Sequence, residues 1–163
     1  MQAKDVIRNS MDMSDHVVGA YLDGLSDADL LIRPVEGANH LAWQLGHLIA
    51  SERQMLEIVK PGASPALPEG FEANHSKETA ASDDPKRFST KAEYLRLWKA
   101  QREATKKVLD GVTDADLDDA DPNKYPPYAP GMGALLNMMG AHFMMHAGQF
   151  AVVRRKLKLP VVI

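Results

Sequence analysis

The stretch from residue 135 to residue 153, LLNMMGAHFMMHAGQFAVV, limits the possible folds of this chain more than any other, because it is long, apolar and uncharged. It contains His142 and His146, which lie on the same side of a helix because they are four residues apart. At about 100° per residue, both imidazoles fall within the apolar stripe of that helix. We therefore predict a buried central helix with two stacked imidazoles on its inner face. The stripe consists of Leu135, Met138, Met139, His142, His146, Gln149 and Val153.

Two interpretations of this histidine pair stay open at this stage. A single histidine on an apolar face usually bonds to a backbone carbonyl or to water inside a core. Two histidines at positions i and i+4 can instead bind one cation, whereas two neutral rings side by side would need separate partners among Met, Leu, Ala and Gly. The pair is either two core histidines or half of a metal site.

The segment from residue 132 to residue 153 is also long enough to cross a membrane. Its polar side chains argue against that, because polar groups inside a bilayer are costly, and a buried central helix is favoured. The first ten residues, MQAKDVIRNS, lack the basic region and apolar run of a signal peptide, so we expect a cytoplasmic protein. The polar side chains are those of Asn137, His142, His146 and Gln149.

Composition narrows the chemistry further. With 163 residues the chain fits a single domain, residues 1–163, and its net charge of -3 with scattered Lys and Arg gives no electrostatic case for nucleic-acid binding. The chain contains no cysteine, which excludes disulfides, thiolate metal ligands and a cysteine nucleophile. Thiol chemistry would therefore need an external thiol.

Three amphipathic segments precede the central helix. Helical spacing predicts a first helix over residues 6–25 and a second that runs to residue 59 with Asn39 as its N-cap. A third begins at Thr90, which has the capping-box spacing to Glu93. Four helices predict an all-α four-helix bundle, and the run 154–156, Arg-Arg-Lys, is interpreted as a solvated cap on the last helix. The third helix is expected to point inward Tyr94, Trp98, Gln101, Thr105, Val108 and Val112.

Two turns of nearly the same sequence, GLSDADL at residues 24–30 and GVTDADL at residues 111–117, indicate an internal repeat. In each turn a Ser or Thr and the Asp three residues later have the spacing of a capping box. A slightly larger shift aligns residues 41–47 with residues 136–142, so we expect two related helical hairpins. The segment 60–89 between them is predicted to be a surface crossover, with a lid as the alternative.

The second predicted helix supplies a third imidazole. Between residues 41 and 50 only Gln44 and His47 are polar, which predicts that His47 is buried. His40 lies two turns away, roughly 10 Å along the axis, so it is expected to cap or border the helix and not to share a metal. Three neutral imidazoles with one open position are typical of a catalytic zinc site, and nickel, iron or manganese would also suit. The three are His47, His142 and His146.

Two histidine motifs give the chain a resemblance to the DinB-like family, also described through its YfiT-like metal-dependent hydrolases. They are NHLAWQLGH at residues 39–47 and HFMMHAGQ at residues 142–149, followed by RKLKLP at residues 155–160. The family carries one histidine on its second helix and an HxxxH motif on its last, so the resemblance implies that His47, His142 and His146 bind a divalent metal. It also implies a bundle over essentially the whole chain, homodimers and, in some members, a low-molecular-weight thiol as co-substrate.

Two functions of different class follow. The chain is either a metalloenzyme that activates an external thiol or water for S-transfer, isomerisation or hydrolysis of a small electrophile, or a non-catalytic, stress-related metal-binding bundle. An open position facing a cavity would favour the enzyme, and a fourth protein ligand would favour the bundle. The candidates to support the ligands or to move protons are Gln149, Gln44, Ser51 and Glu52. For Glu52 a salt bridge across the bundle explains the position equally well.

Overall fold

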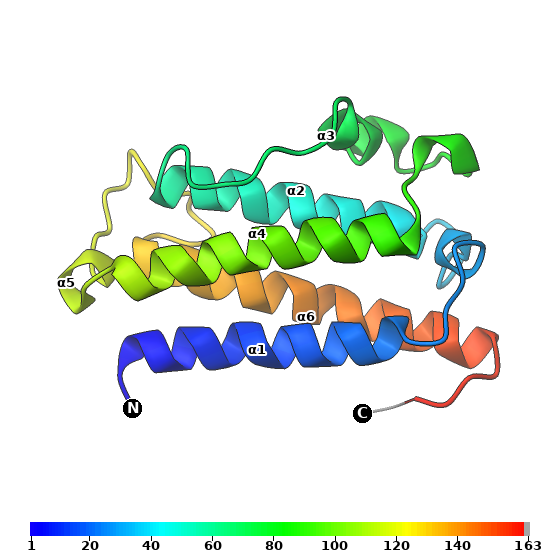
Figure 1. Ribbon diagram of the computed structural model, residues 1–163, viewed down its shortest axis with the longest axis horizontal. Helices are drawn as coiled ribbons and strands as arrows, with labels where there is room; N and C mark the ends of the chain where they lie inside the picture. The colour runs from blue at the N-terminus through cyan, green and yellow to red at the C-terminus, as the bar shows by residue number, and fades with distance from the viewer. Residues whose placement is uncertain (162–163) are drawn as a thin grey trace.

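A computed structural model describes residues 1–161, which form helices and loops and no strand. The predicted all-α class is confirmed, and the long helices of this part lie side by side (Figure 1). None of its helices is long and apolar enough to cross a membrane. The long helices are α1 (Ala3–Leu22), α2 (Leu41–Val59), α4 (Lys91–Gly111) and α6 (Met132–Lys156); the short elements are α3 (Phe71–Asn74), α5 (Asp114–Leu117) and the 3-10 turns η1 (Asp29–Leu31), η2 (Lys77–Thr79) and η3 (Pro85–Arg87).

Helix α6 packs most extensively on α1 and also contacts α2, while α2 packs on α4 (Figure 1). A Cβ atom at Gly140 would lie 2.9 Å from Ser10 Oγ and 3.0 Å from Met11 N, so this glycine permits the close approach of α1 and α6. Within residues 1–161 the closely packed pairs are therefore not the consecutive helices α1 and α2. The internal repeat of two related hairpins stays a prediction.

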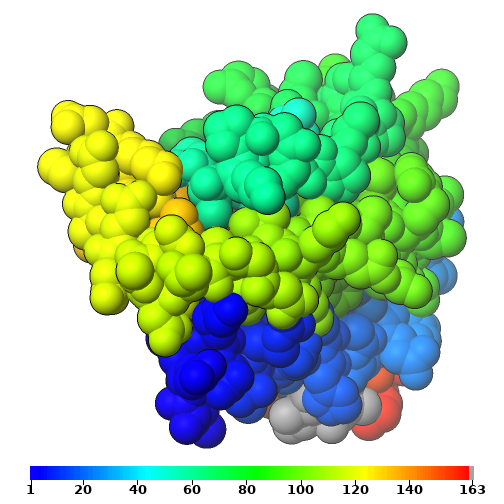
Figure 2. All heavy atoms as spheres, turned by 60° about the vertical axis from the view of Figure 1, so that its left-hand side comes forward, coloured from blue at the N-terminus to red at the C-terminus, as the bar shows by residue number. Residues whose placement is uncertain are grey.

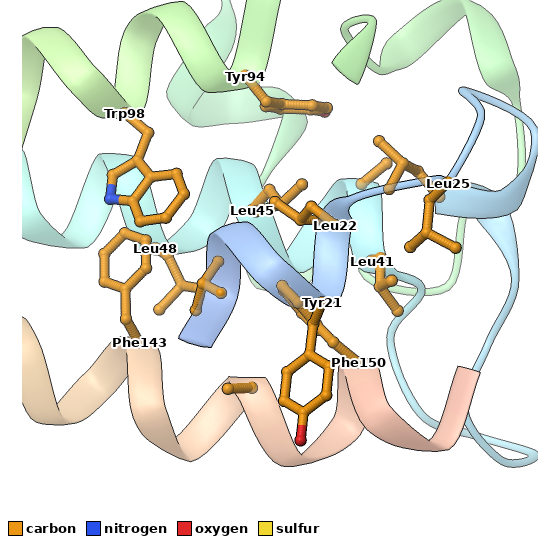
Figure 3. Packing of buried hydrophobic residues seen from close by; sticks show 14 of the residues in the cluster. Tyr21, Leu22, Leu25, Leu41, Leu45, Leu48, Tyr94, Trp98, Phe143 and Phe150 are labelled. Carbon is orange, nitrogen blue, oxygen red and sulfur yellow. The ribbon is translucent and has the colours of Figure 1, made fainter. Parts of the chain in front are cut away.

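Two apolar clusters fill the space between the long helices. In the larger one, Trp98 of α4 stacks on Phe143 of α6 with ring centroids 5.2 Å apart, and Tyr94 lies one turn away on α4 (Figure 3). The smaller cluster surrounds Leu56 and Met139 at the other end of the helices. Each fully buried side chain of this size stabilises the fold by about 1.5–3 kcal/mol. The two clusters thus hold the long helices in place, and with them the polar side chains that these helices carry.

The cap of α2 differs from the prediction by one residue. His40 is the N-cap, and its Nδ1 accepts the backbone N–H of Trp43 at 3.0 Å. The predicted cap Asn39 is therefore wrong by one residue, because the side chain of His40, and not that of Asn39, accepts this N–H. His40 is fully buried, so it caps the helix, as expected, but does not lie at a rim.

The predicted capping residues of the other helices are confirmed. Thr90 Oγ1 accepts the N–H of Glu93 at 3.3 Å, although the Glu93 carboxylate pairs with Arg96 and not with the cap. In both repeated turns the two capping bonds are present, between Ser26 and Asp29 before η1 and at the start of α5. The first helix ends at Leu22, three residues before the predicted end, and the repeated turn follows it.

Arg154 does not form the predicted solvated cap. Its side chain is buried, and Nη1 donates to the carbonyls of Tyr21 at 3.0 Å and Asp23 at 2.5 Å, at the end of α1. Its Nε donates to the carbonyl of Pro160 at 2.8 Å. The prediction is wrong for this residue because the guanidinium satisfies the C-terminal carbonyls of a neighbouring helix, where its charge also complements the helix dipole.

Candidate metal centre

Three histidines from two helices meet on one flank of the structure. His47 lies on α2, and His142 and His146 lie one turn apart on α6. The ring centroid of His47 is 5.1 Å from that of His142 and 5.7 Å from that of His146, and the two α6 rings are 5.0 Å apart. One ring nitrogen of each lies within 4.8 Å of the other two. Two nitrogens bound to one tetrahedral zinc at 2.0–2.1 Å are roughly 3.4 Å apart, a distance that falls within these 4.8 Å.

The three rings border the core and do not lie in its middle. All three are half-buried, whereas the fully buried face of α6 passes through neighbouring positions. The predicted placement of the imidazoles inside the apolar stripe is therefore wrong by about one position. Helix α6 is apolar nearly all round, so its periodicity could not separate the core face from the flank. The buried face consists of Leu135, Met139, Phe143, Ala147 and Phe150.

A cavity of about 710 Å³ opens beside His47, His142 and His146, which we call the triad. Its wall includes His47 and Ser51 from α2 and His142 from α6, together with Tyr128 from the loop before α6. Figure 2 shows this loop and the start of the segment after α2 on either side of a notch, with part of α6 visible between them. A small molecule entering the cavity would meet two of the three imidazoles directly.

Gln44 determines which nitrogen of His146 carries the proton. Gln44 is fully buried, and its Nε2 donates to Asn39 O at 2.6 Å and to Gln149 Oε1 at 3.0 Å. Because both amide protons are donated, Gln44 Oε1 acts as the acceptor, and it lies 2.8 Å from His146 Nδ1. The Nδ1 of His146 is therefore protonated, which leaves the lone pair on Nε2 for a ligand. Metal-binding histidines are commonly oriented in this way through their other ring nitrogen.

The other two imidazoles lack a hydrogen-bond partner in the protein, as far as residues 1–161 are concerned. The ring of His47 lies parallel to that of Trp43, with centroids 4.9 Å apart and planes inclined by 10°. That stacking fixes the plane of the ring without using its nitrogens. Within residues 1–161 these nitrogens are not among the fully buried side-chain atoms that lack a partner, so they stay accessible to a ligand. The free nitrogens of His47 and His142 are consistent with a ligand that completes the site.

Burial lowers the pKa of all three imidazoles, because loss of water disfavours the charged form. It lowers the pKa of His142 and of His146 to about 4, with the neighbouring imidazoles adding to the effect. Burial also lowers the pKa of His47, and the positive charge of Lys77 acts in the same direction. The three rings are therefore neutral at pH 7, which is the form of imidazole that binds a metal.

This donor set fits a divalent transition metal. Three neutral nitrogens without a carboxylate suit zinc, and also nickel or iron. Within residues 1–161 no fourth His, Asp or Glu joins the group. His47, His142 and His146 would hold the ion, and a fourth position would be left to water or to a ligand from outside the chain.

Glu52 lies on the same helix as His47 but faces another part of the interior. It is fully buried, and its partners are on α4: Arg102 Nη2 lies 3.3 Å from Glu52 Oε2, and Thr105 Oγ1 donates to Oε1 at 2.7 Å. Burial raises the pKa of Glu52, and the positive charge of Arg102 opposes this shift. The salt bridge across the bundle that was the alternative for Glu52 is therefore present.

Arg102 was not predicted to lie in the interior, although it lies four residues after Trp98 and so continues the inward stripe of α4. Its Nε is 2.9 Å from Asp15 Oδ1 of α1, and its guanidinium lies 4.8 Å from the centre of the Phe143 ring. The helical spacing was a usable signal, but a charged residue at such a position is usually assigned to a solvated face. Arg102, Asp15 and Glu52 form a group that we call the charge cluster.

The segment between α2 and α4 is less superficial than predicted. Phe71 and His75 are buried, and the two nitrogens of His75 lie 2.7 Å from the Phe71 carbonyl and from Tyr94 Oη. A Cβ atom at Gly46 would lie 2.0 Å from His75 Cδ2, so the imidazole packs on α2 only because position 46 is glycine. The prediction of a surface crossover is wrong for this part, and a glycine inside an apolar helix was the signal that could have shown it.

Comparison with known families decides the relationship of the chain. A family model described as the DinB superfamily matches residues 12–150. The chain belongs to the DinB superfamily. The match contains the three candidate ligands of this DinB-superfamily protein, His47, His142 and His146, together with Gln44 and Gln149, and it bears out the resemblance carried by the two histidine motifs. No curated protein and no solved structure matches the chain significantly.

Proposed function

We propose that this DinB-superfamily protein is a metal-dependent enzyme in which His47, His142 and His146 hold a divalent ion. The supporting observation is that three neutral imidazoles meet beside a cavity of about 710 Å³, with His47 and His142 in its wall. An ion bound there would lower the pKa of an external thiol or water and so provide a nucleophile near neutral pH. The reaction would be an S-transfer, isomerisation or hydrolysis of a small electrophile. Zinc is the metal we favour, with nickel, iron and manganese as alternatives.

The arrangement supports an enzyme better than a purely structural metal site. Structural zinc sites are closed by four protein ligands and commonly include cysteine, whereas catalytic sites keep a position for water or substrate. The chain has no cysteine, and the group within residues 1–161 has three ligands. The nucleophile would therefore come from outside the chain. The alternative is a non-catalytic metal-binding protein, which would bind the ion without turnover.

The residues around the triad would position the ligands and handle the proton. Gln44 and Gln149 form a chain of hydrogen bonds that keeps Nε2 of His146 available. Ser51 lies one turn after His47 and lines the cavity, where its hydroxyl can donate to or accept from a bound nucleophile. Met55 and Met138 make the adjoining wall apolar, which strengthens electrostatic interactions at the triad by limiting water.

Metal analysis is the first test of this proposal. The full chain, purified without added metal and without a His tag, should contain about one divalent ion per protein. A screen of small thiols against electrophiles should then reveal turnover that depends on both the thiol and the metal. Metal binding without turnover in such a screen, together with a fourth protein ligand on the ion, would favour the non-catalytic alternative.

A pair of histidine variants tests the assignment of the ligands. His146→Ala should lower metal affinity by roughly 100-fold or more, since even the loss of an outer hydrogen bond to a ligand costs 10–100-fold. Turnover should fall with it. His16→Ala is the matched control, because His16 is exposed on α1 and should leave both properties unchanged. His40 would be a poor control, because it is buried and caps α2. A His146→Ala protein with full metal content would contradict the assignment.

A further inference from the structure

Lys77 is the residue of the cavity wall that carries a permanent charge. It is exposed, lies at the start of η2, and lines the same cavity as His47 and His142. The lining residues include no acidic side chain, and within residues 1–161 Lys77 forms no ion pair. The carboxylate of the neighbouring Glu78, which does not line the cavity, interacts electrostatically with Lys77. The cavity wall itself therefore presents one positive charge and no negative one.

The backbone before Lys77 is tied to the helix that carries His47. The carbonyl of Ser76 accepts a hydrogen bond from Trp43 Nε1 at 3.0 Å and another from Thr79 Oγ1 at 2.9 Å. The ring of Trp43 is the one that stacks on His47. Through these contacts the backbone at Ser76 is coupled to the helix that carries His47, so the Lys77 side chain extends from an anchored position in the chain.

Most of the remaining cavity wall is apolar. Met55 and Ile58 come from α2, and Met138 and Met145 come from α6. A ligand that fills this space would therefore combine an apolar body with a group able to interact with the Lys77 ammonium. An ammonium acts as a compact point charge, and it attracts an anion while it repels a cation of the same size.

We propose that Lys77 makes the site selective for small ligands that carry a carboxylate or another anionic group, and against cationic ligands of similar size. The inference rests on the proposed metal-dependent function and adds the charge class of its substrate. In this role Lys77 determines specificity and takes no part in bond making. Loss of its charge should change the affinity for anionic ligands and leave metal retention unchanged.

The test uses three small thiols that differ in charge, 3-mercaptopropionate, 2-mercaptoethanol and cysteamine. Isothermal titration calorimetry measures the dissociation constant of each for the zinc-loaded full chain and its variants. Because the thiols differ in their own acidity, the readout is the change that a variant makes for each thiol. Lys77→Gln should weaken binding of 3-mercaptopropionate by about two- to fivefold, the range of an exposed ion pair. It should leave 2-mercaptoethanol unchanged and improve cysteamine.

Two controls make the result specific to charge and to position. Lys77→Arg keeps the charge and should retain the preference, while Lys86→Gln removes an exposed lysine that does not line the cavity and should change nothing. The effect of Lys77→Gln should also shrink in high salt. An equal change for all three thiols, or no change for any, would overturn the inference.

Metal content, measured separately by atomic emission, distinguishes failure of the charge selectivity from failure of the proposed metal-dependent function. If the unmodified protein retains zinc but shows no dependence on Lys77, only the charge selectivity fails. If it retains no metal, the metal-dependent function fails. The same comparison of the three thiols is then made on the metal-free protein by ligand-detected NMR, where loss of the Lys77 dependence would again contradict the inference.

Discussion

The charge cluster and the triad, two groups of polar side chains between the helices of this protein, are built in opposite ways. In the charge cluster, Glu52 and Asp15 flank Arg102, and opposite charges from three helices neutralise one another in the interior. In the triad, three uncharged imidazoles from two helices face one another without a carboxylate. His47 and His142 also lack a protein hydrogen-bond partner within residues 1–161.

The difference separates a structural role from a binding role. Opposite charges buried together are each other's partners, so removing one destabilises the fold. Ring nitrogens that converge without partners are satisfied only by something from outside the chain. Substitutions in the charge cluster are therefore expected to lower stability, and substitutions around the triad are expected to lower metal affinity.

The largest effect is expected for Arg102→Met. This change leaves the fully buried Glu52 without its cation, and breaking a buried pair in this way costs about 3–5 kcal/mol. Urea denaturation of the metal-free variant would measure the free energy of unfolding. Its metal affinity, once folded, should equal that of the unmodified protein, because Arg102 does not belong to the triad.

Lys99→Met is the matched control for Arg102→Met, since Lys99 is exposed on the same helix and should cost less than about 0.5 kcal/mol. A small loss of stability for Arg102→Met, or a loss of metal binding by the folded variant, would break the proposed division between the two groups.

A loss of metal affinity is expected for Gln44→Met. The methionine cannot accept the proton of His146 Nδ1, so metal affinity should fall by about 10- to 100-fold. Gln44→Glu keeps an oxygen acceptor at this position and should retain more of the affinity. Titration with zinc against a chelator of known affinity measures both. Equal affinity in the two variants would show that this hydrogen bond does not orient the ligand.

In the metal-free protein, a fall in pH should destabilise the fold through the imidazoles of the triad and stabilise it through Glu52 of the charge cluster. The pKa of His142 and of His146 is about 4 in the folded chain and near 6.5 when unfolded, so the unfolded state binds more protons between these values. Stability should therefore fall as the pH falls from 6.5 to 4, by about 1 kcal/mol for each half-buried ring. Glu52 has a raised pKa, so its own contribution changes the other way, and stability is lost as the pH rises above 4.5.

Urea denaturation at a series of pH values would check this sign. The variant His142→Ala/His146→Ala should show a flatter dependence below pH 6.5, and Glu52→Gln a steeper one, because it removes the opposing contribution. A steeper acid dependence in the histidine variant would mean that these rings are not held neutral in the folded protein.

Much of the triad could be predicted from the sequence, because its signals are local. Spacing of four residues placed His142 and His146 on one side of a helix. The rarity of polar residues around His47 singled it out, although it is half-buried and not buried as predicted. The family resemblance joined the two motifs. The bond from Gln44 to His146 could not be predicted, since it depends on how α2 and α6 are placed against each other.

The burial of Arg102 in the charge cluster and the cap formed by Arg154 were not predicted, for a common physical reason. A lone arginine in a helix is usually solvated, and its burial becomes favourable only when partners from distant segments surround it. The partners of Arg102 come from α1 and α2, and those of Arg154 include the last carbonyls of α1. Sequence separation hides such contacts, whereas helical periodicity and capping spacing are visible in one segment.

The central claim is that three imidazoles hold one ion and leave a coordination position for an external ligand. X-ray absorption spectroscopy of the zinc-loaded full chain tests it most directly. The account predicts about three nitrogen ligands at 2.0–2.1 Å and one further light atom, which a small thiol such as 3-mercaptopropionate replaces with sulfur near 2.3 Å. A spectrum unchanged by thiol, or one that the His146→Ala variant reproduces at full metal content, would contradict it.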